Sequence, residues 1–148
     1  MEKYASIVCV ALVLLLGYTD ADPEELNQKI NEASSKCKTR LNPPDDVVNT
    51  VISTGILKDE NSEIGTCFVQ CVMEELGIVK DGVFSILENF EKIKVSMEKH
   101  KRPDGSGPDP EKVEKEITEC AAAGIGDTAC AKNYRIWACM MEKRAAWI

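Results

Sequence analysis

Six cysteines are the most prominent residues of this chain that could carry chemistry. The 148-residue sequence has seven cysteines, and six follow residue 30, with 29, 3, 48, 9 and 8 residues between neighbours. An even set at such uneven spacing is typical of a disulfide framework in an exported protein. The six are Cys37, Cys67, Cys71, Cys120, Cys130 and Cys139. We therefore expect three disulfides in a small stapled domain.

The other reactive side chains do not form a catalytic or metal-binding set. The chain has one histidine, His100, so no second imidazole is available for a zinc site. Its neighbours are Lys99 and Lys101, and neither is a partner for nucleophilic catalysis. The segment 104–109 resembles a calcium loop only superficially, because Pro108 stands where a ligand is needed. We predict no enzymatic activity, no metal and no cofactor. We interpret His100 as a solvated residue at a helix C-terminus, with a pH sensor as the weaker alternative.

The first 21 residues have the features of an export signal. A positively charged start precedes the unbroken apolar run Ile7–Leu16, and small residues follow it. Ten apolar residues are too few for a membrane anchor, which takes about 20. Cleavage after Ala21, or alternatively after Gly17, removes Cys9 and leaves an even number of cysteines. The expected mature chain is one domain, residues 22–148.

The composition of this domain restricts its partners. The whole chain has a net charge of −7, and the leader contains one lysine and two acidic residues, so the mature charge is −6. An acidic domain is a poor partner for nucleic acid or for an anionic membrane. We predict a soluble extracellular protein that binds no nucleic acid.

The elements that must position the cysteines are helices, because helix start and stop signals are frequent and strand alternation is nearly absent. The domain is predicted to be all-α, with six helices. They are expected to begin at Asp22, Asp45, Ser62, Asp81, Asp109 and Asp127, and the last to end near Ala146. Helical spacing predicts that apolar residues including Val47, Val48, Val51, Ile52, Ile64, Val83 and Phe84 lie on buried faces.

Helix geometry restricts how the cysteines can pair. Cys67 and Cys71 share one helix face with Cβ atoms about 5–6 Å apart, whereas a disulfide needs about 3.8 Å. Cys130 and Cys139 lie on opposite faces of one helix, about 13 Å apart along its axis. Excluding these two pairs leaves ten of the fifteen possible connectivities open.

The spacing Cys37-x29-Cys67-x3-Cys71-x48-Cys120-x9-Cys130-x8-Cys139 resembles the pattern of insect odorant-binding proteins, the pheromone-binding and general odorant-binding superfamily. The resemblance covers the whole mature chain, and the x3 and x8 gaps are its most specific features. The x48 gap is somewhat long, which we assign to the proline- and glycine-rich loop 102–110. The resemblance implies interlocked disulfides, Cys37–Cys71, Cys67–Cys130 and Cys120–Cys139, all within the ten open sets.

A helical carrier of this kind encloses an apolar cavity with few polar groups. The apolar stripes supply ten candidate ligand-binding residues: Phe68, Val72, Leu76, Leu87, Phe90, Met97, Ile117, Tyr134, Trp137 and Met141. For each one taken singly, ordinary core packing is the simpler interpretation. Tyr134 and Trp137 have polar tips that could bind a ligand carbonyl or hydroxyl. Trp147 and Ile148 either fold back as a small lid or fray.

The resemblance implies a secreted carrier of small hydrophobic molecules, odorants or pheromones, that delivers them to a membrane odorant receptor. A 5% aromatic content favours an aliphatic pocket, suited to chains, terpenoids or esters. The expected oligomeric state is a monomer or a weak homodimer. The alternative is a secreted, disulfide-stapled interaction or membrane-active helical protein without a small-molecule pocket.

Overall fold

The computed structural model describes residues 23–99 and 103–143. The expected leader 1–21, the cap at Asp22, His100 and the C-terminal Trp147 and Ile148 lie outside the described residues. The helices are α2 (Pro23–Leu41), α3 (Asp45–Thr54), α4 (Glu63–Glu75), α5 (Phe90–Lys99), α6 (Pro110–Ala122) and α7 (Ala129–Lys143). Two strands, β1 (Val79–Lys80) and β2 (Val83–Phe84), and a 3-10 helix, η1 (Ile86–Asn89), lie between α4 and α5. The predicted all-α fold is confirmed.

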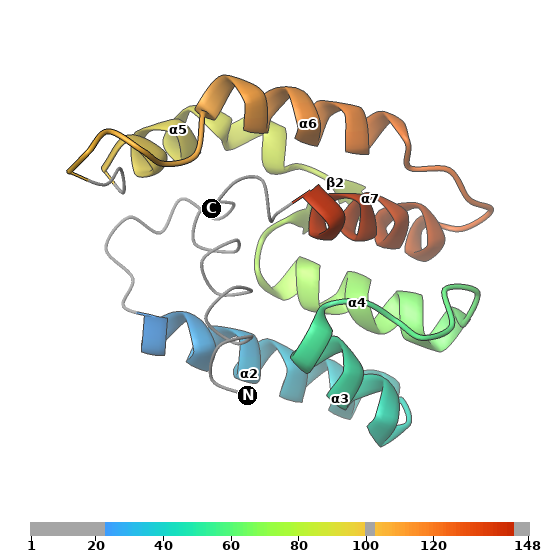
Figure 1. Ribbon diagram of the computed structural model, residues 1–148. Coiled ribbons are helices and arrows are strands. Elements are labelled where there is room, and N and C mark those ends of the chain that lie inside the picture. Colours follow the sequence, from blue (N-terminus) through green and yellow to red (C-terminus); the bar gives the residue numbers. More distant parts are fainter. Residues whose placement is uncertain (1–22, 100–102, 144–148) are drawn as a thin grey trace.

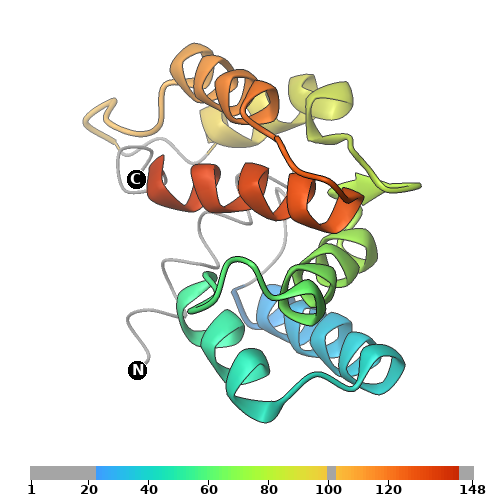
Figure 2. The ribbon, with the colours of Figure 1, turned by 90° about the vertical axis from the view of Figure 1, so that its right-hand side faces the viewer.

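The helices are arranged in three layers. Figures 1 and 2 show α2 and α3 on one side, α4 and α7 in the middle, and α5 and α6 on the other side. The most extensive contacts join α4 to α7, α2 to α4 and α6 to α7. α4 and α7 therefore lie between the outer layers and supply much of the buried core.

Two expected helix boundaries follow directly from capping chemistry. The Ser62 hydroxyl accepts a hydrogen bond from the Gly65 amide at 3.1 Å, which satisfies an amide that has no partner within α4. Asp109 does the same for the Glu111 amide at 3.1 Å, with Pro110 at the first position of α6. The C-terminus of α3 also follows from the sequence. This helix ends at Gly55, whose φ of 76° is the left-handed conformation that glycine adopts without strain.

The predicted fourth helix begins later than its sequence indicates. Asp81 and Gly82 have φ values of 53° and 77° and form the turn of a hairpin, in which Val79 pairs with Phe84. Two successive positive φ values are typical of the type I′ turn that an Asp-Gly pair favours. The assignment of Asp81 as a helix cap is therefore wrong, and α5 begins at Phe90.

Four smaller predictions also need correction. The last helix begins at Ala129, and its cap is Thr128, whose hydroxyl accepts from the Ala131 amide at 3.1 Å, so Asp127 is not the cap. Ile52, Ile64 and Val83, expected on buried helix faces, are 41%, 39% and 64% exposed, and Val83 lies in β2. Helical spacing shows which apolar residues lie on the same face of a helix. It does not show how far along that face the neighbouring helix covers them.

Three disulfides connect the layers. Cys37–Cys71 joins α2 to α4, Cys67–Cys130 joins α4 to α7, and Cys120–Cys139 joins α6 to α7. These are the three pairs that the family resemblance implies. Because each bridge links two different helices, α4 and α7 are each held at two points.

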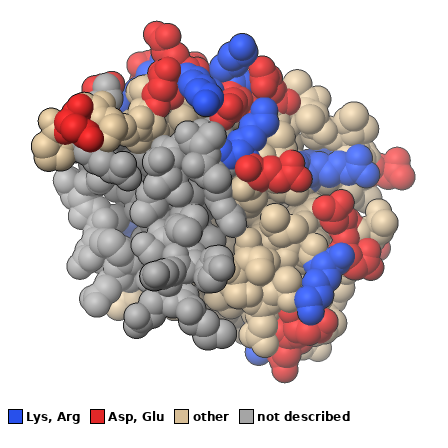
Figure 3. All heavy atoms as spheres, viewed as in Figure 1, with Lys and Arg blue, Asp and Glu red and all other residues tan. Residues whose placement is uncertain are grey.

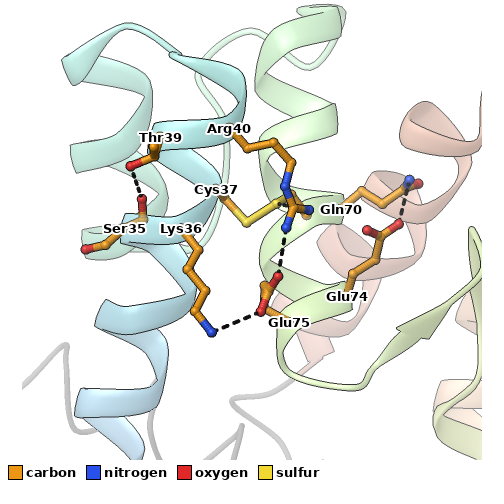
Figure 4. Close-up of a disulfide and its surroundings, with 9 residues drawn as sticks. Ser35, Lys36, Cys37, Thr39, Arg40, Gln70, Glu74 and Glu75 are labelled. Atoms are coloured by element: carbon orange, nitrogen blue, oxygen red, sulfur yellow. Dashed lines mark hydrogen bonds and ion pairs between the residues drawn. A yellow bond between two sulfur atoms is a disulfide. The ribbon is translucent and has the colours of Figure 1, made fainter.

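The contact between α2 and α4 is reinforced at its surface. Figure 4 shows Lys36 and Arg40 of α2 on both sides of the Cys37–Cys71 bridge, each reaching Glu75 of α4, at 3.7 Å and 3.1 Å. Exposed ion pairs of this kind contribute about 0–1 kcal/mol each. The disulfide, rather than the ion pairs, is therefore the main constraint on this helix pair.

Within the described residues no helix combines the length and apolarity that a bilayer crossing requires. The same part of the chain contains no cluster of three or more His, Cys, Asp or Glu side chains that could hold a metal ion.

Candidate functional site

An apolar pocket lies where α2, α3, α4 and α7 meet. Its volume is about 40 Å³, which is room for a few water molecules, since one needs about 10–15 Å³. It is lined by Ile30, Ser34, Val51, Ile52, Gly55, Val69, Val72, Met73, Leu76 and Trp137. None of these described lining residues has a charged side chain. The wall therefore suits uncharged, mainly hydrocarbon groups.

The α4 wall of the pocket follows from helical periodicity. Val69, Val72, Met73 and Leu76 recur at spacings of 3, 1 and 3 residues, so they share one face. The next face of α4 holds Phe68 and Cys71, which belong to a separate buried cluster. One helix thus presents a pocket wall on one side and a sealed cluster on the other.

Trp137 of α7 lines the pocket with its polar tip already bonded. The indole Nε1–H donates to the Gly55 carbonyl at 2.7 Å, and the bond is buried. The same glycine ends α3, so the bond ties α7 to the α3–α4 connection. The expectation that this indole binds a ligand is therefore not supported, because its one donor is in use.

Tyr134, one turn before Trp137, is buried in the core, with 1% of its surface exposed. Its hydroxyl accepts from the Leu57 amide at 2.9 Å. Burial raises the pKa of the Tyr134 phenol above its usual value, because a phenolate would lose its hydration. The hydrogen bond from Leu57 acts in the opposite direction, and the negative charge of Glu60 adds to the increase. Tyr134 therefore fixes the α3–α4 connection rather than lining the pocket.

The ten candidate residues divide between the pocket and the core. Val72, Leu76 and Trp137 line the pocket. Phe68 belongs to the sealed cluster with Cys37, Val48 and Cys71. The remaining six pack in or against the main core: Leu87, Phe90, Met97, Ile117, Tyr134 and Met141. Only the first three are therefore brought together at this site.

Seven lining residues were not among the ten sequence candidates: Ile30, Ser34, Val51, Ile52, Gly55, Val69 and Met73. Ser34 is the polar one among them. It follows Ile30 by four residues and precedes Cys37 by three, so it lies on the apolar face of α2. That spacing was available in the sequence. A serine among apolar positions gives no signal in a pattern built on hydrophobic residues alone, which explains the omission.

A second hollow on the molecule has a different character. It has a volume of about 180 Å³ and is lined by Asp46, Val47, Thr50, Leu57, Lys58, Asp59 and Ser62. Two of its polar groups hold local turns, since Asp59 accepts from the Asn61 amide and Ser62 from Gly65. Mixed charges and hydroxyls make this hollow unsuitable for a hydrophobic molecule.

Charges on the visible face are intermixed. Figure 3 shows Lys and Arg side chains interspersed with Asp and Glu side chains, without a single-sign patch on that face. Some charges of the described residues are paired: Lys94 contacts Glu114 at 2.8 Å, and Lys143 contacts Glu119 at 3.2 Å. A nucleic-acid interface would need a basic stripe, which this face lacks.

A family model matches most of the chain. The PBP/GOBP family model, which describes pheromone-binding and general odorant-binding proteins, covers residues 19–143. The chain belongs to this family. No curated protein and no solved structure matches the chain. PBP/GOBP proteins are secreted binding proteins rather than enzymes, and the three disulfides fit an extracellular member.

Proposed function

We propose that this PBP/GOBP protein carries one small hydrophobic molecule in the apolar pocket between α2, α3, α4 and α7. The observation that carries the proposal is the composition of the pocket wall. Eight of its ten residues have purely apolar side chains or none: Ile30, Val51, Ile52, Gly55, Val69, Val72, Met73 and Leu76. Burying a hydrocarbon ligand there gains about 25 cal/mol per Å² of apolar surface.

The pocket must widen to hold an odorant-sized ligand. Its volume of about 40 Å³ is far below the roughly 300–1,000 Å³ of ordinary ligand sites. Ile52 is 41% exposed and Leu76 is half-buried, so both side chains have room to move outward. We expect ligand entry to displace these two residues and to leave the disulfide-bound part of α4 in place.

Delivery to a membrane receptor and secretion after cleavage at Ala21 belong to the same proposal. The three disulfides support an extracellular fluid as the place of action, because they persist in an oxidising environment. The monomer or weak homodimer stays a prediction, as does the role of the other seven candidate residues.

Displacement of an environment-sensitive fluorescent probe tests the proposal. We expect aliphatic odorant-like molecules to displace the probe at micromolar concentration. Val72→Phe fills the pocket and is expected to weaken probe binding by about 10-fold or more. Val95→Phe is the matched control, because Val95 is an exposed residue of α5 outside the pocket. Circular dichroism and thermal melting check that both variants fold.

Two outcomes would contradict the proposal. The first is the absence of probe displacement across a broad panel of neutral hydrophobic ligands. The second is an equal affinity loss in Val72→Phe and Val95→Phe, which would place the probe elsewhere. If Val72→Phe does not fold, Val51→Phe blocks the same pocket from α3. A vesicle-leakage assay separately tests the membrane-active alternative.

A further inference from the structure

The pocket contains a buried polar side chain, Ser34, for which the described residues supply no hydrogen-bond partner. Ser34 is 4% exposed and lines the pocket. Its hydroxyl makes no hydrogen bond that the described part of the chain provides. Buried hydroxyls are almost always hydrogen-bonded, and an exception needs an explanation. A bound ligand that supplies the missing partner is such an explanation.

The rest of the wall cannot perform this role. Among the ten lining residues that the structure describes, only Ser34 and Trp137 have a polar N–H or O–H group in their side chains. The Trp137 indole is bonded to Gly55, and an indole has no second donor. Among the described residues of the wall, Ser34 is therefore the side chain whose polar group is available to a ligand atom.

We propose that Ser34 selects neutral ligands with one hydrogen-bonding oxygen, such as an alcohol, aldehyde, ketone or ester, on a hydrocarbon frame. This inference rests on the proposed carrier function. A hydroxyl both donates and accepts, so it binds carbonyl and hydroxyl oxygens alike. A carboxylate or ammonium group is disfavoured, because the described lining has no charged residue to compensate the loss of hydration.

The position of Ser34 gives the proposed contact a fixed geometry. It lies on α2 one turn before Cys37, whose disulfide to Cys71 holds α2 against α4. The serine backbone is therefore held in place while Ile52 and Leu76 move. A ligand would lie with its oxygen at α2 and its hydrocarbon part against α4 and Trp137.

The neighbouring Ser35 provides a matched control. It is exposed, and in Figure 4 it points away from α4. Its backbone carbonyl accepts from the Thr39 hydroxyl at 3.0 Å, a bond that the substitution Ser35→Ala keeps. Ser34→Ala and Ser35→Ala therefore each remove a serine hydroxyl from α2, the first from the buried pocket wall and the second from the exposed surface.

The experiment measures the affinity of both variants and the wild type for an alcohol, an aldehyde, an n-alkane and a carboxylate of one chain length. For Ser34→Ala we expect about a 3- to 10-fold loss for alcohol and aldehyde, the usual effect of losing one hydrogen bond. Alkane affinity is expected to stay within about twofold, and the carboxylate to bind weakest throughout. Ser35→Ala is expected to behave as the wild type.

A second pair of variants keeps the test decisive if Ser34→Ala binds abnormally for steric reasons. Ser34→Thr keeps the hydroxyl, and Ser34→Val has nearly the same shape without it. We expect the threonine variant to prefer the alcohol over the alkane more strongly than the valine variant does. Unfolding stability of Ser34→Ala is expected to stay unchanged or to rise slightly, because no protein hydrogen bond is lost.

The outcomes separate this inference from the carrier function. If the wild type binds none of the ligands, the carrier proposal is wrong and the role of Ser34 falls with it. If the wild type binds them but Ser34→Ala changes alcohol and alkane affinity by the same factor, only the role of Ser34 is overturned. A clear loss of stability in Ser34→Ala would likewise overturn it, by revealing a partner within the protein.

Discussion

The two ends of the contact between α2 and α4 differ in packing. At one end Cys37, Val48, Phe68 and Cys71 form a sealed cluster in which every side chain is buried. At the other end, one turn earlier along α2, Ser34 borders the apolar pocket. The disulfide at the sealed end holds the two helices together. The neighbouring turn can therefore keep unfilled space without separating them.

The buried polar side chains in and near the pocket also differ from one another, in whether the protein supplies their hydrogen-bond partner. Tyr134 and Trp137 reach the α3–α4 connection and bond to the Leu57 amide and the Gly55 carbonyl. Ser34 has no such bond within the described residues. Tyr134 and Trp137 are thus satisfied within the protein, whereas Ser34 is the group for which we propose a ligand partner.

Removing the disulfide at the sealed end has the largest expected effect. The double variant Cys37→Ala, Cys71→Ala removes a cross-link between cysteines that are 34 residues apart in the sequence. The free energy of unfolding should fall by about 4 kcal/mol, because the unfolded chain is no longer restricted by this loop. Urea unfolding monitored by circular dichroism measures this loss. Probe affinity should also fall, because α2 no longer holds its side of the pocket.

Removing the disulfide Cys120–Cys139 is the matched control. Its 19-residue separation gives a loss of about 3 kcal/mol, so the two variants have similar stability. This bridge joins α6 to α7 and leaves the α2–α4 contact intact. An equal loss of probe affinity in both variants would show that the pocket does not depend on the sealed end.

Tyr134→Phe removes a buried hydroxyl that has a hydrogen-bond partner within the protein. The buried Leu57 amide then has no acceptor, and the free energy of unfolding should fall by about 1–3 kcal/mol. Urea unfolding of this variant and of Ser34→Ala gives the contrast. An unchanged stability in Tyr134→Phe would mean that water or another group replaces the phenol.

Most of the helices could be predicted from the sequence, because capping residues are local signals. Helix geometry left ten cysteine pairings open, and the pairing was supplied by the family resemblance. Ser62 and Asp109 cap their helices as expected. The hairpin at Asp81–Gly82 was missed although an Asp-Gly pair is a strong turn signal. The surrounding apolar residues were read as helical, and a two-residue strand offers too little alternation to correct that interpretation.

The pocket was less predictable, since its lining depends on which helix faces meet in three dimensions. Leu76 and Phe90 have similar apolar character in the sequence, but only Leu76 reaches the pocket. Ile52 was expected to be buried and lies at the partly exposed rim instead. Helical spacing places residues on a face, but the distance between two faces is a tertiary property.

A pair of valines on α3 compares the two ends directly. Val48 belongs to the sealed cluster, and Val51 borders the pocket. Val48→Ala should cost about 2 kcal/mol, because its two methyl groups leave a buried cavity. Val51→Ala should cost about 1 kcal/mol or less, since it is only half-buried and already borders free space. Urea unfolding compares them, and equal costs would argue that the pocket end is packed as tightly as the cluster.

The ionisation of Tyr134 gives the smallest and most specific effect. The folded pKa lies above the unfolded value of about 10, chiefly because burial disfavours the phenolate. The unfolded chain therefore loses its proton first as pH rises. The contribution of Tyr134 to stability is full below about pH 10 and is lost as pH rises through its folded pKa.

Tyr134 is the one tyrosine in residues 22–148, so tyrosinate absorbance of a protein consisting of these residues reports this group alone. We expect its titration midpoint to lie above that of the urea-unfolded protein. Tyr134→Phe, which cannot ionise, should show a weaker decline of stability above about pH 10 than the wild type. A midpoint equal to the unfolded value would mean that water reaches the phenol, and the α3–α4 connection would then resemble the open pocket rather than the sealed cluster.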